Sequence, residues 1–324
     1  MRKLSILLPF AMLSSGYMLE AHSEEVTPYI VNGTDISASL HPSFVSLFYD
    51  RIDYNGTYGG TYCGGTLLDS QHILTAAHCI YDSTEYQLFT SVVPQLQNES
   101  DFPNSVIQRV MVNEFYYRND YNDTTLANDI AILKLASPIT AVTSYATLAV
   151  TADESSYRVT PSEVFYAVGH GNTQTGVDAS DSLQRTQLSY VANTDCNVYT
   201  TDTSANLCMT GAATVVYDNG TCQGDSGGPL YWNSKQVGIT SFGPNTCGDP
   251  SVTPNSVFTE VSDHEAWITS VLAGNESPKI TVNDAQRNAS LSSSGGGGGG
   301  GGGSLGYLSF LLISAALFRR KLTS

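Results

Sequence analysis

The sequence around Ser226 reads Cys222-Gln223-Gly224-Asp225-Ser226-Gly227-Gly228-Pro229, which sets a hydroxyl between glycines and beside a carboxylate. A serine hydroxyl is a weak nucleophile at its ordinary pKa. It needs a base, a group that orients this base, and hydrogen-bond donors for the oxygen that becomes charged. The stretch therefore predicts a nucleophilic active-site loop, and the remainder of the chain is expected to supply the other groups.

The composition limits the class of partner. The chain has 324 residues, with 14 basic and 30 acidic side chains and a formal net charge of -16. Nucleic acids and anionic membrane surfaces require a basic footprint, so neither is expected as a partner of the folded part. The length is sufficient for a sizeable hydrophobic core.

The first 23 residues have the layout of a secretory signal peptide. Arg2 and Lys3 precede the apolar run Leu4 to Leu13, and small residues follow. An exported chain meets oxidising compartments, so its 6 cysteines are expected to be paired, although the pairing stays open at this point. No C-x-x-C pair occurs, and a metal site built on cysteines is therefore not expected.

Short β-type runs, separated by clusters of Gly, Asn, Asp and Ser, extend from Ile30 to about Ala273. Such regular short strands with almost no helical period predict an all-β fold of antiparallel barrels or sandwiches. The runs are Phe44 to Tyr49, Gly65 to Leu68, Val106 to Val112, Ile130 to Leu135, Val164 to Val168, Leu183 to Val191, Val237 to Phe242 and Val257 to Val261.

One helix is predicted at residues 262–273. Ser262 and Glu265 fit a capping box, and Gly274 can end the helix. An apolar face made mainly by Trp267, Ile268 and Val271 should bury itself. We expect the tryptophan to pack against the last barrel.

The composition changes after Gly274. Residues 275–304 are rich in Ser, Asn and Gly and end in the glycine run Gly295 to Gly303, which predicts a flexible linker with no core. Residues 305–324 begin with an apolar segment that reaches Phe318 and end with a basic cluster around Arg320. This segment predicts a helix of marginal length for a bilayer.

Two further stretches complete a constellation with the Ser226 loop. One is Thr75-Ala76-Ala77-His78-Cys79, which follows a strand-like segment, and the other is Asn128-Asp129-Ile130-Ala131-Ile132-Leu133. All three, in this order, resemble the trypsin and chymotrypsin family of serine endopeptidases over about Ile30 to Gly274. The resemblance implies two antiparallel six-stranded β-barrels, at about 30–148 and 149–261, with the active site between them and one C-terminal helix after them. It also implies a secreted hydrolase of protein or peptide substrates that uses no cofactor and no metal.

The catalytic roles of that family fall on residues of these stretches. Ser226 is expected to attack the scissile carbonyl, His78 to move the proton, and Asp129 to hold the imidazole in the productive tautomer. The backbone N–H groups of Gly224 and Ser226 are expected to form the oxyanion hole. A carboxylate beside Ile130 in a strand should be buried and partnered.

The resemblance further implies an inactive precursor. In this family the chain is cut before an Ile-Val sequence, here before Ile30, which makes residues 24–29 a short propeptide. The new α-amino group of Ile30 would pair with Asp225 and set the oxyanion loop. Tyr29 departs from the Arg or Lys that usually precedes the cut, so the identity of the activating protease stays open.

The family pattern also selects one set of disulfides. It pairs Cys63 with Cys79, Cys196 with Cys208, and Cys222 with Cys247. The first bridge would fix the loop that carries the base, and the third would brace the substrate pocket.

The substrate-binding residues implied by the family are Gly220, Thr221, Gln223, Ser241, Phe242 and Gly243. Ser241 and Gly243 are expected to pair with the substrate backbone as an added strand. Trypsin-like enzymes carry an aspartate at the position of Gly220, and without a carboxylate the desolvation of a Lys or Arg side chain is costly. We therefore predict a large uncharged P1 residue, aromatic or leucine. The alternative is trypsin-like cleavage with an acid supplied by Asp218 or another loop.

The end of the chain, from about Ser292 to Ser324, resembles the Gly-Gly sorting tail of exported proteins of Gram-negative bacteria. That resemblance implies a C-terminal sorting protease of the rhomboid type as a partner and export through the periplasm. The protein would then be extracellular or bound to the cell surface, with membrane contact only through the unprocessed tail. The alternative is an ordinary membrane anchor flanked by positive residues.

A hypothesis from another class is a surface-displayed binding protein or adhesin on a catalytically dead protease scaffold. A missing triad member would favour it. His78, Asp129 and Ser226 are all present.

Overall fold

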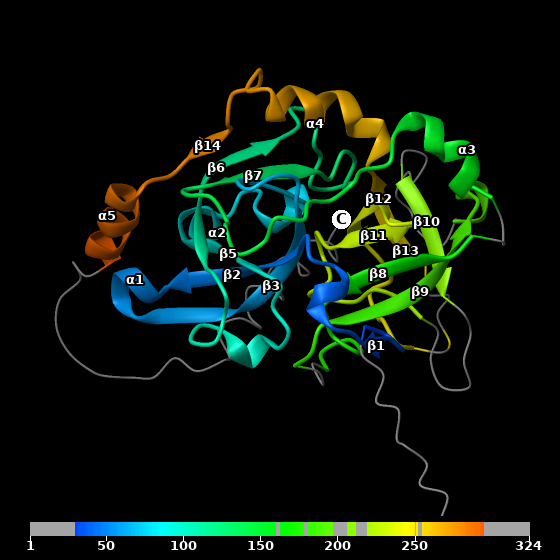
Figure 1. Cartoon of the computed structure of the whole chain (residues 1–324), viewed down its shortest axis with the longest axis horizontal. Helices are drawn as coiled ribbons and strands as arrows, with labels where there is room; N and C mark the ends of the chain where they lie inside the picture. Colours follow the sequence, from blue (N-terminus) through cyan, green and yellow to red (C-terminus); the bar gives the residue numbers. More distant parts are fainter. Residues whose placement is uncertain are drawn as a thin grey trace, which may run out of the picture.

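The computed structural model describes residues 30–159, 163–177, 181–196, 206–211, 219–249, 251 and 255–294. Its strands form two separate antiparallel sheets, each closed on itself, and the two barrels lie side by side (Figure 1). The predicted pair of six-stranded barrels is therefore confirmed. The predicted signal peptide, the predicted propeptide and residues 295–324 lie outside the described residues.

The first barrel has the strand order β6-β5-β2-β3-β4-β7 and closes through the pairing of β6 with β7. Its strands are β2 (Phe44–Arg51), β3 (Thr57–Leu67), β4 (His72–Thr75), β5 (Thr90–Pro94), β6 (Val110–Tyr117) and β7 (Ala131–Leu135). Its core contains large apolar side chains such as Leu47, Ile73 and Phe115, which are fully buried.

The second barrel has the strand order β9-β10-β13-β12-β11-β8 and closes through the pairing of β8 with β9. Its strands are β8 (Phe165–Gly169), β9 (Gln184–Val191), β10 (Asn206–Gly211), β11 (Pro229–Trp232), β12 (Lys235–Phe242) and β13 (Ser256–Glu260). Along β9, Gln184, Thr186 and Leu188 are buried while Arg185 and Gln187 face outward. This period of two is the pattern expected of a strand with one buried face.

Two short strands extend these barrels. The strand β1 (Thr34–Asp35) pairs with β9, so the N-terminal segment of the described chain joins the second barrel. The strand β14 (Ile280–Thr281) pairs with β6, so the C-terminal segment joins the first barrel. Each barrel thus holds a segment from the opposite end of the chain.

All eight β-type runs of the sequence overlap strands of the structure, and the strand-like segment before His78 is β4. The barrel strands β5, β10 and β11 were not predicted. Five α-helices and six short 3₁₀-helices connect the described strands. They are α1 (Ile52–Asn55), α2 (Thr84–Phe89), α3 (Glu154–Tyr157), α4 (Glu265–Leu272), α5 (Asp284–Ser294), η1 (Ala38–Leu40), η2 (Ala77–Cys79), η3 (Glu99–Asp101), η4 (Thr151–Asp153), η5 (Asn193–Asp195) and η6 (Ser262–His264).

The helix predicted at residues 262–273 differs in two respects. Its first turn is η6, and no side chain caps it, because the Ser262 hydroxyl lies 3.0 Å from the phenol oxygen of Tyr157 instead. The prediction of a capping box is therefore wrong. Trp267 packs against the core of the first barrel, not of the last, since α4 crosses back toward that barrel (Figure 1).

The expectation of a flexible linker from residue 275 is wrong for the segment that contains β14 and α5. Val282 is buried in the first-barrel core, and Arg287 is only 1% exposed. The Ser- and Asn-rich composition gives little helical pattern, so contacts with the barrel must select this conformation.

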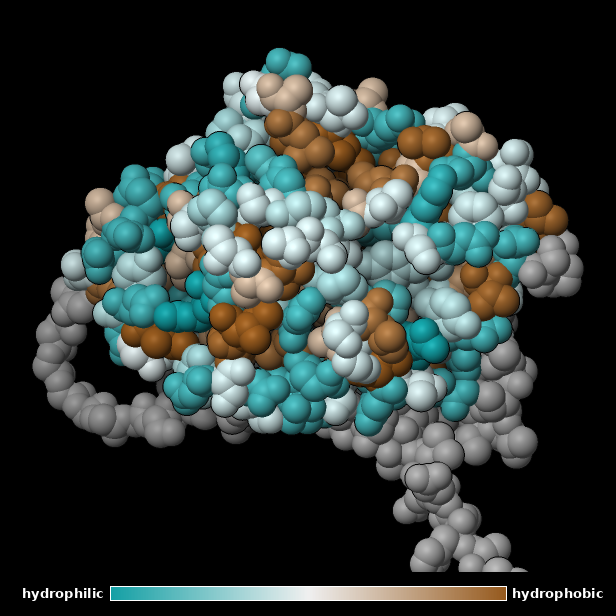
Figure 2. All heavy atoms as spheres, in the orientation of Figure 1, coloured by the Kyte–Doolittle hydropathy of each residue, from teal (hydrophilic) through white to brown (hydrophobic). Residues whose placement is uncertain are grey.

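Within the described residues, no helix is both long and apolar enough to cross a membrane. On the face seen in Figure 2, apolar side chains occur in small separate groups among hydrophilic ones.

Candidate active site

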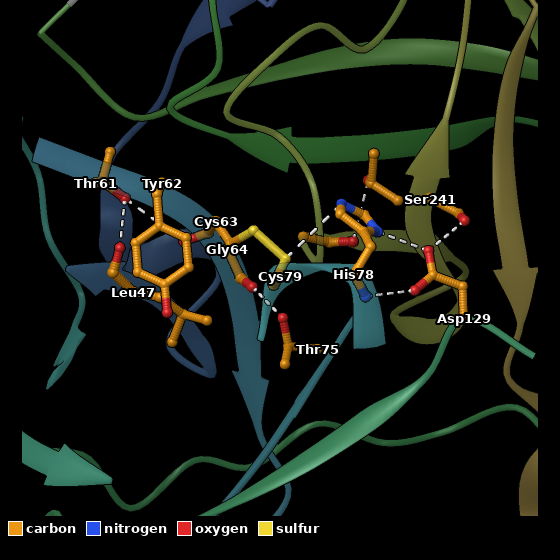
Figure 3. The surroundings of a disulfide bond; sticks show 12 residues. Leu47, Thr61, Tyr62, Cys63, Gly64, Thr75, His78, Cys79, Asp129 and Ser241 are labelled. Atoms are coloured by element: carbon orange, nitrogen blue, oxygen red, sulfur yellow. Dashed lines mark hydrogen bonds and ion pairs between the residues drawn. A yellow bond between two sulfur atoms is a disulfide. The ribbon is translucent and has the colours of Figure 1, made fainter. Parts of the chain in front are cut away.

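His78 lies in η2, directly after the strand β4 of the first barrel. Its Nδ1 is 2.7 Å from Oδ2 of Asp129, and its backbone N–H donates to Oδ1 of the same carboxylate over 2.9 Å. Two contacts to one carboxylate fix the imidazole both in position and in orientation (Figure 3).

Asp129 precedes β7 and is fully buried, as the sequence predicted. A second donor to its Oδ2 is the hydroxyl of Ser241, at the end of β12 in the other barrel (Figure 3). The hydroxyl of Thr259 also donates to the backbone carbonyl of Asp129 over 2.9 Å. Residues of both barrels therefore hold this carboxylate. Burial by itself lowers the pKa of His78, but the charge and hydrogen bond of Asp129 outweigh burial, and the net pKa is raised.

Ser226 is half-buried in the loop before β11. Its carbonyl accepts a hydrogen bond of 2.7 Å from the N–H of Gly64 in β3. Its neighbour Gly227 has a φ of +74°, and a Cβ there would lie 2.2 Å from the hydroxyl oxygen of Thr75, three residues before His78. The serine loop of the second barrel is thus pressed against the strands of the first barrel that carry the histidine.

Gly224 has a φ of +102°, which side-chain-bearing residues rarely adopt. A Cβ at this position would also lie 2.8 Å from Cα of Gly171. Both observations explain why glycine occupies this position in the loop. The positive φ belongs to the bend that carries the chain from Cys222 to Ser226.

Asp225 is 1% exposed and accepts hydrogen bonds of 2.9 Å from the N–H groups of Gly171 and Cys222. Within the part of the chain that the structure describes, no cation forms an ion pair with it. Burial raises the pKa of this carboxyl to about 7, although the two backbone hydrogen bonds oppose the shift.

Two glycines that the sequence did not assign make room for Asp225. A Cβ on Gly169 would lie 2.2 Å from Oδ1 of Asp225, and one on Gly171 would lie 2.4 Å from its Cγ. In the sequence, these two glycines are visible only as the pattern Gly169-His170-Gly171. Their role depends on contact with Asp225, which is more than 50 residues away along the chain, so the pattern alone does not indicate it.

Ile30 is fully buried at the beginning of the described residues. The carbonyl of Val31 accepts a hydrogen bond of 3.3 Å from Gly220, and the Asn32 amide donates to Asn219 over 2.5 Å. The segment that begins at Ile30 therefore lies against the residues that precede the Ser226 loop.

The two predicted pocket segments both adjoin β13. Phe242 pairs with Val257 of that strand, and the neighbouring Ser256, which the sequence did not mark, contacts Thr221. The Ser256 hydroxyl accepts from both the N–H and the hydroxyl of Thr221, each over 2.9 Å. Thr221 and Ser256 are both buried, and Gly220 is the residue directly before Thr221. Asp218, the acid of the alternative hypothesis, lies outside the described residues.

The remaining predicted pocket residues occupy a strand end and a loop. Phe242 ends β12 half-buried, packed against the cluster around Cys196 and Cys208, and Gly243 follows it. Gln223 is exposed, with its amide oxygen near the sulfurs of Cys222 and Cys247.

All three predicted disulfides are present in the structure. They join Cys63 to Cys79, Cys196 to Cys208, and Cys222 to Cys247. The sulfurs of Cys63 and Cys79 come within 4.8 Å of a ring nitrogen of His78, an arrangement that resembles a metal site. Because these two sulfurs are bonded to each other, they are not available as thiolate ligands.

Comparisons with known proteins agree with this geometry. Residues 30–268 match the sequence model of the family described as Trypsin. Brachyurin of Leptuca pugilator is 31% identical over 243 residues, which cover 74% of this chain and 96% of the relative. Alkaline trypsin B of Manduca sexta is 32% identical over 238 residues, covering 72% and 88% of the two chains. Chymotrypsin-like elastase family member 1 of Macaca fascicularis is 31% identical over 257 residues, covering 78% and 92%.

Proposed function

Because the chain belongs to the trypsin family of serine endopeptidases, we propose that Ser226, His78 and Asp129 form its catalytic triad. The observation that supports these roles best is the buried Asp129 carboxylate, which binds both the ring and the backbone of His78. The hydrogen bond between Gly64 and Ser226 and the close approach of Gly227 to Thr75 further support the pairing of Ser226 with His78.

The proposed reaction has two halves. In the first, the Ser226 Oγ attacks the scissile carbonyl while Nε2 of His78 takes its proton, and the tetrahedral oxyanion is bound by the N–H groups of Gly224 and Ser226. The C–N bond then breaks, His78 gives the proton to the leaving amine, and an ester to Ser226 remains. In the second half, His78 takes a proton from water while the water oxygen attacks the ester carbonyl. The C–O bond to Ser226 then breaks, His78 returns the proton to the Ser226 Oγ, and the acyl part leaves as a carboxylic acid.

Activation by cleavage before Ile30 is part of the proposal. It is supported by the burial of Ile30, whose neighbour Val31 accepts a hydrogen bond from Gly220, and by the burial of Asp225 without a cationic partner among the described residues. The new ammonium group would supply this partner and hold the oxyanion loop. Asp225→Asn should yield a folded protein with almost no activity after cleavage before Ile30. Full activity of this variant would refute the proposed activation.

For specificity, we propose a large uncharged P1 residue, aromatic or leucine. The proposal is supported by the pair of hydroxyls from Thr221 and Ser256 beside Gly220, which offers a polar but uncharged lining. The named relatives include both a trypsin and an elastase, so their names do not select one specificity.

A panel of peptide anilides that differ only at P1 tests this assignment. Phe, Tyr or Leu should give the highest kcat/KM, and Lys or Arg at least about tenfold less. Ser256→Asp should reverse that order, because it adds a carboxylate to the pocket lining. A preference of the unchanged enzyme for Lys or Arg would contradict the proposal and favour an acid supplied by Asp218.

We also propose that the protein is exported through the periplasm of a Gram-negative bacterium and acts on protein substrates outside the cell. The support is the sequence of both ends, which resemble a signal peptide and a Gly-Gly sorting tail. Intact-mass analysis of the mature protein should find that Phe318 and Arg319 have been removed. Their retention would favour the membrane-anchor hypothesis.

A further inference from the structure

The C-terminal segment that contains β14 and α5 is built into the first barrel. The N–H of Lys279 donates to Phe115, and that of Val282 donates to Asn113, each over 2.8 Å, on either side of the strand pair β14–β6. From there α5 reaches the end of the barrel that carries α1 and α2 (Figure 1). The segment therefore extends the protease domain well past α4.

Arg287 is the residue through which α5 binds the barrel. It is 1% exposed, and its guanidinium donates to the backbone carbonyls of Leu88 over 2.7 Å and Val112 over 2.5 Å. A third donor binds Asp284 over 2.8 Å. A buried guanidinium with partners on a helix, a strand and its own helix joins these three elements rigidly.

The carbonyl of Leu88 belongs to the last turn of α2, where backbone carbonyls have no partner within the helix. Arg287 satisfies it and places a positive charge at the negative end of the helix. The other end of α2 has its own contacts, because Ser83 caps it and Glu85 forms an ion pair with Arg51. Arg287 is thus the contact from α5 that fixes the C-terminal end of α2.

The helix α2 carries Tyr86, whose ring stacks on Tyr62 with centroids 4.3 Å apart and an interplanar angle of 21°. Tyr62 immediately precedes Cys63, which is bonded to Cys79 beside His78. Both tyrosines are half-buried, so they contribute to the surface beside the bridge between Cys63 and Cys79.

Figure 3 shows on which side of His78 this surface lies. Tyr62 and the disulfide are on one side of the imidazole, and Asp129 and Ser241 are on the other. Ser241 begins the segment that is expected to pair with the substrate backbone and to line the P1 pocket. The P1 residue carries the carbonyl that Ser226 is proposed to attack, so the acyl part of the substrate lies on this side. The opposite side, with Tyr62 and Tyr86, therefore receives the part of the substrate that leaves.

We propose that Arg287 is a positioning residue for leaving-group recognition, acting through α2 and the stacked pair Tyr86 and Tyr62. The C-terminal segment would then tune which residues are accepted after the scissile bond, without contacting substrate. The assignment of sides rests on the proposed triad and the proposed substrate orientation.

The test compares two substrates with the same acyl peptide in the mature enzyme. One is a methyl ester, and the other continues for three residues beyond the scissile bond. Arg287→Met should lower kcat/KM for the extended peptide by about tenfold, chiefly by raising KM, while kcat/KM for the ester stays within about twofold. Arg287→Lys, which keeps the charge but loses the fork of donors, should show a smaller loss of the same kind.

The matched control is Lys235→Met, which breaks an ion pair with Asp153 on the second barrel. It should leave kcat/KM unchanged for both the methyl ester and the extended peptide. Equal losses for both substrates, or no loss for the extended peptide, would overturn the proposal. Tyr86→Ala should reproduce the selective loss, and this variant decides the matter if Arg287→Met does not accumulate as a folded protein. Failure of the unchanged enzyme to cleave either substrate would instead count against the proposed triad.

Discussion

At the scale of single residues, the Asp129 carboxylate receives three donors: Nδ1 and the backbone N–H of His78, and the hydroxyl of Ser241. These contacts leave Nε2 of the imidazole as the nitrogen that would take a proton from Ser226 in the proposed reaction. The raised pKa of His78 follows from the same charge. The Asp129 carboxylate therefore both orients the imidazole of His78 and raises its pKa.

The substitution Asp129→Asn tests this double role of the carboxylate. An amide that turns its NH₂ group toward Nδ1 forces the proton onto Nε2, so His78 can no longer act as the base. We expect kcat to fall by roughly 10⁴-fold, which is the size of the loss that the same substitution causes in the type enzyme of this family. Steady-state kinetics on a peptide anilide measure it.

The pH profile gives a second readout of the same variant. In the unchanged enzyme, kcat/KM should fall toward acid pH as His78 is protonated, with an apparent pKa above the ordinary 6.5. Removal of the Asp129 charge should move this inflection to lower pH. An unchanged inflection, or a kcat within about tenfold of normal, would show that Asp129 has another role.

At the scale of elements, the disulfide between Cys63 and Cys79 ties β3 to η2, which carries His78. Replacing both cysteines by alanine should reduce the free energy of unfolding by about 3 kcal/mol, as expected for a loop of this length. Chemical denaturation of Ser226→Ala protein with and without the bridge measures this difference. A change below about 1 kcal/mol would mean that the barrel alone fixes this turn.

The elements also show what the sequence could predict and what it could not. The eight apolar runs, His78, Asp129 and Ser226 were accessible because each is marked by a pattern within a few neighbouring residues. Ser256 is joined to Thr221 across 35 positions, and Arg287 to Leu88 across 199. Partners that distant leave no local pattern, so the pocket lining and the C-terminal segment emerged only from the fold.

At the scale of the whole molecule, the second barrel holds the carboxyl group of Asp225, which is buried and has no cationic partner among the described residues. Because the pKa of Asp225 is raised to about 7 in the uncut chain, the folded precursor binds a proton that the unfolded chain releases near pH 4. Stability from this group is therefore complete below about pH 4 and is lost as pH rises through about 7.

The precursor should accordingly lose on the order of 4 kcal/mol of unfolding free energy between about pH 4 and pH 8 from this group. The chain cut before Ile30 should lose much less, because the new ammonium pairs with the ionised carboxylate. Urea denaturation of Ser226→Ala protein in both forms measures the contrast, and Asp225→Asn should remove it. Identical pH dependence of the cut and uncut forms would refute the pairing of Ile30 with Asp225.

Covalent labelling by an aryl sulfonyl fluoride, followed by intact-mass analysis and peptide mapping, tests whether Ser226 is the activated nucleophile. We expect one label per molecule, located on Ser226, in protein cut before Ile30. We also expect far slower labelling of the uncut precursor and of His78→Ala. Absence of the label from the cut protein, or its location on another residue, would contradict the assignment of Ser226 as the activated nucleophile.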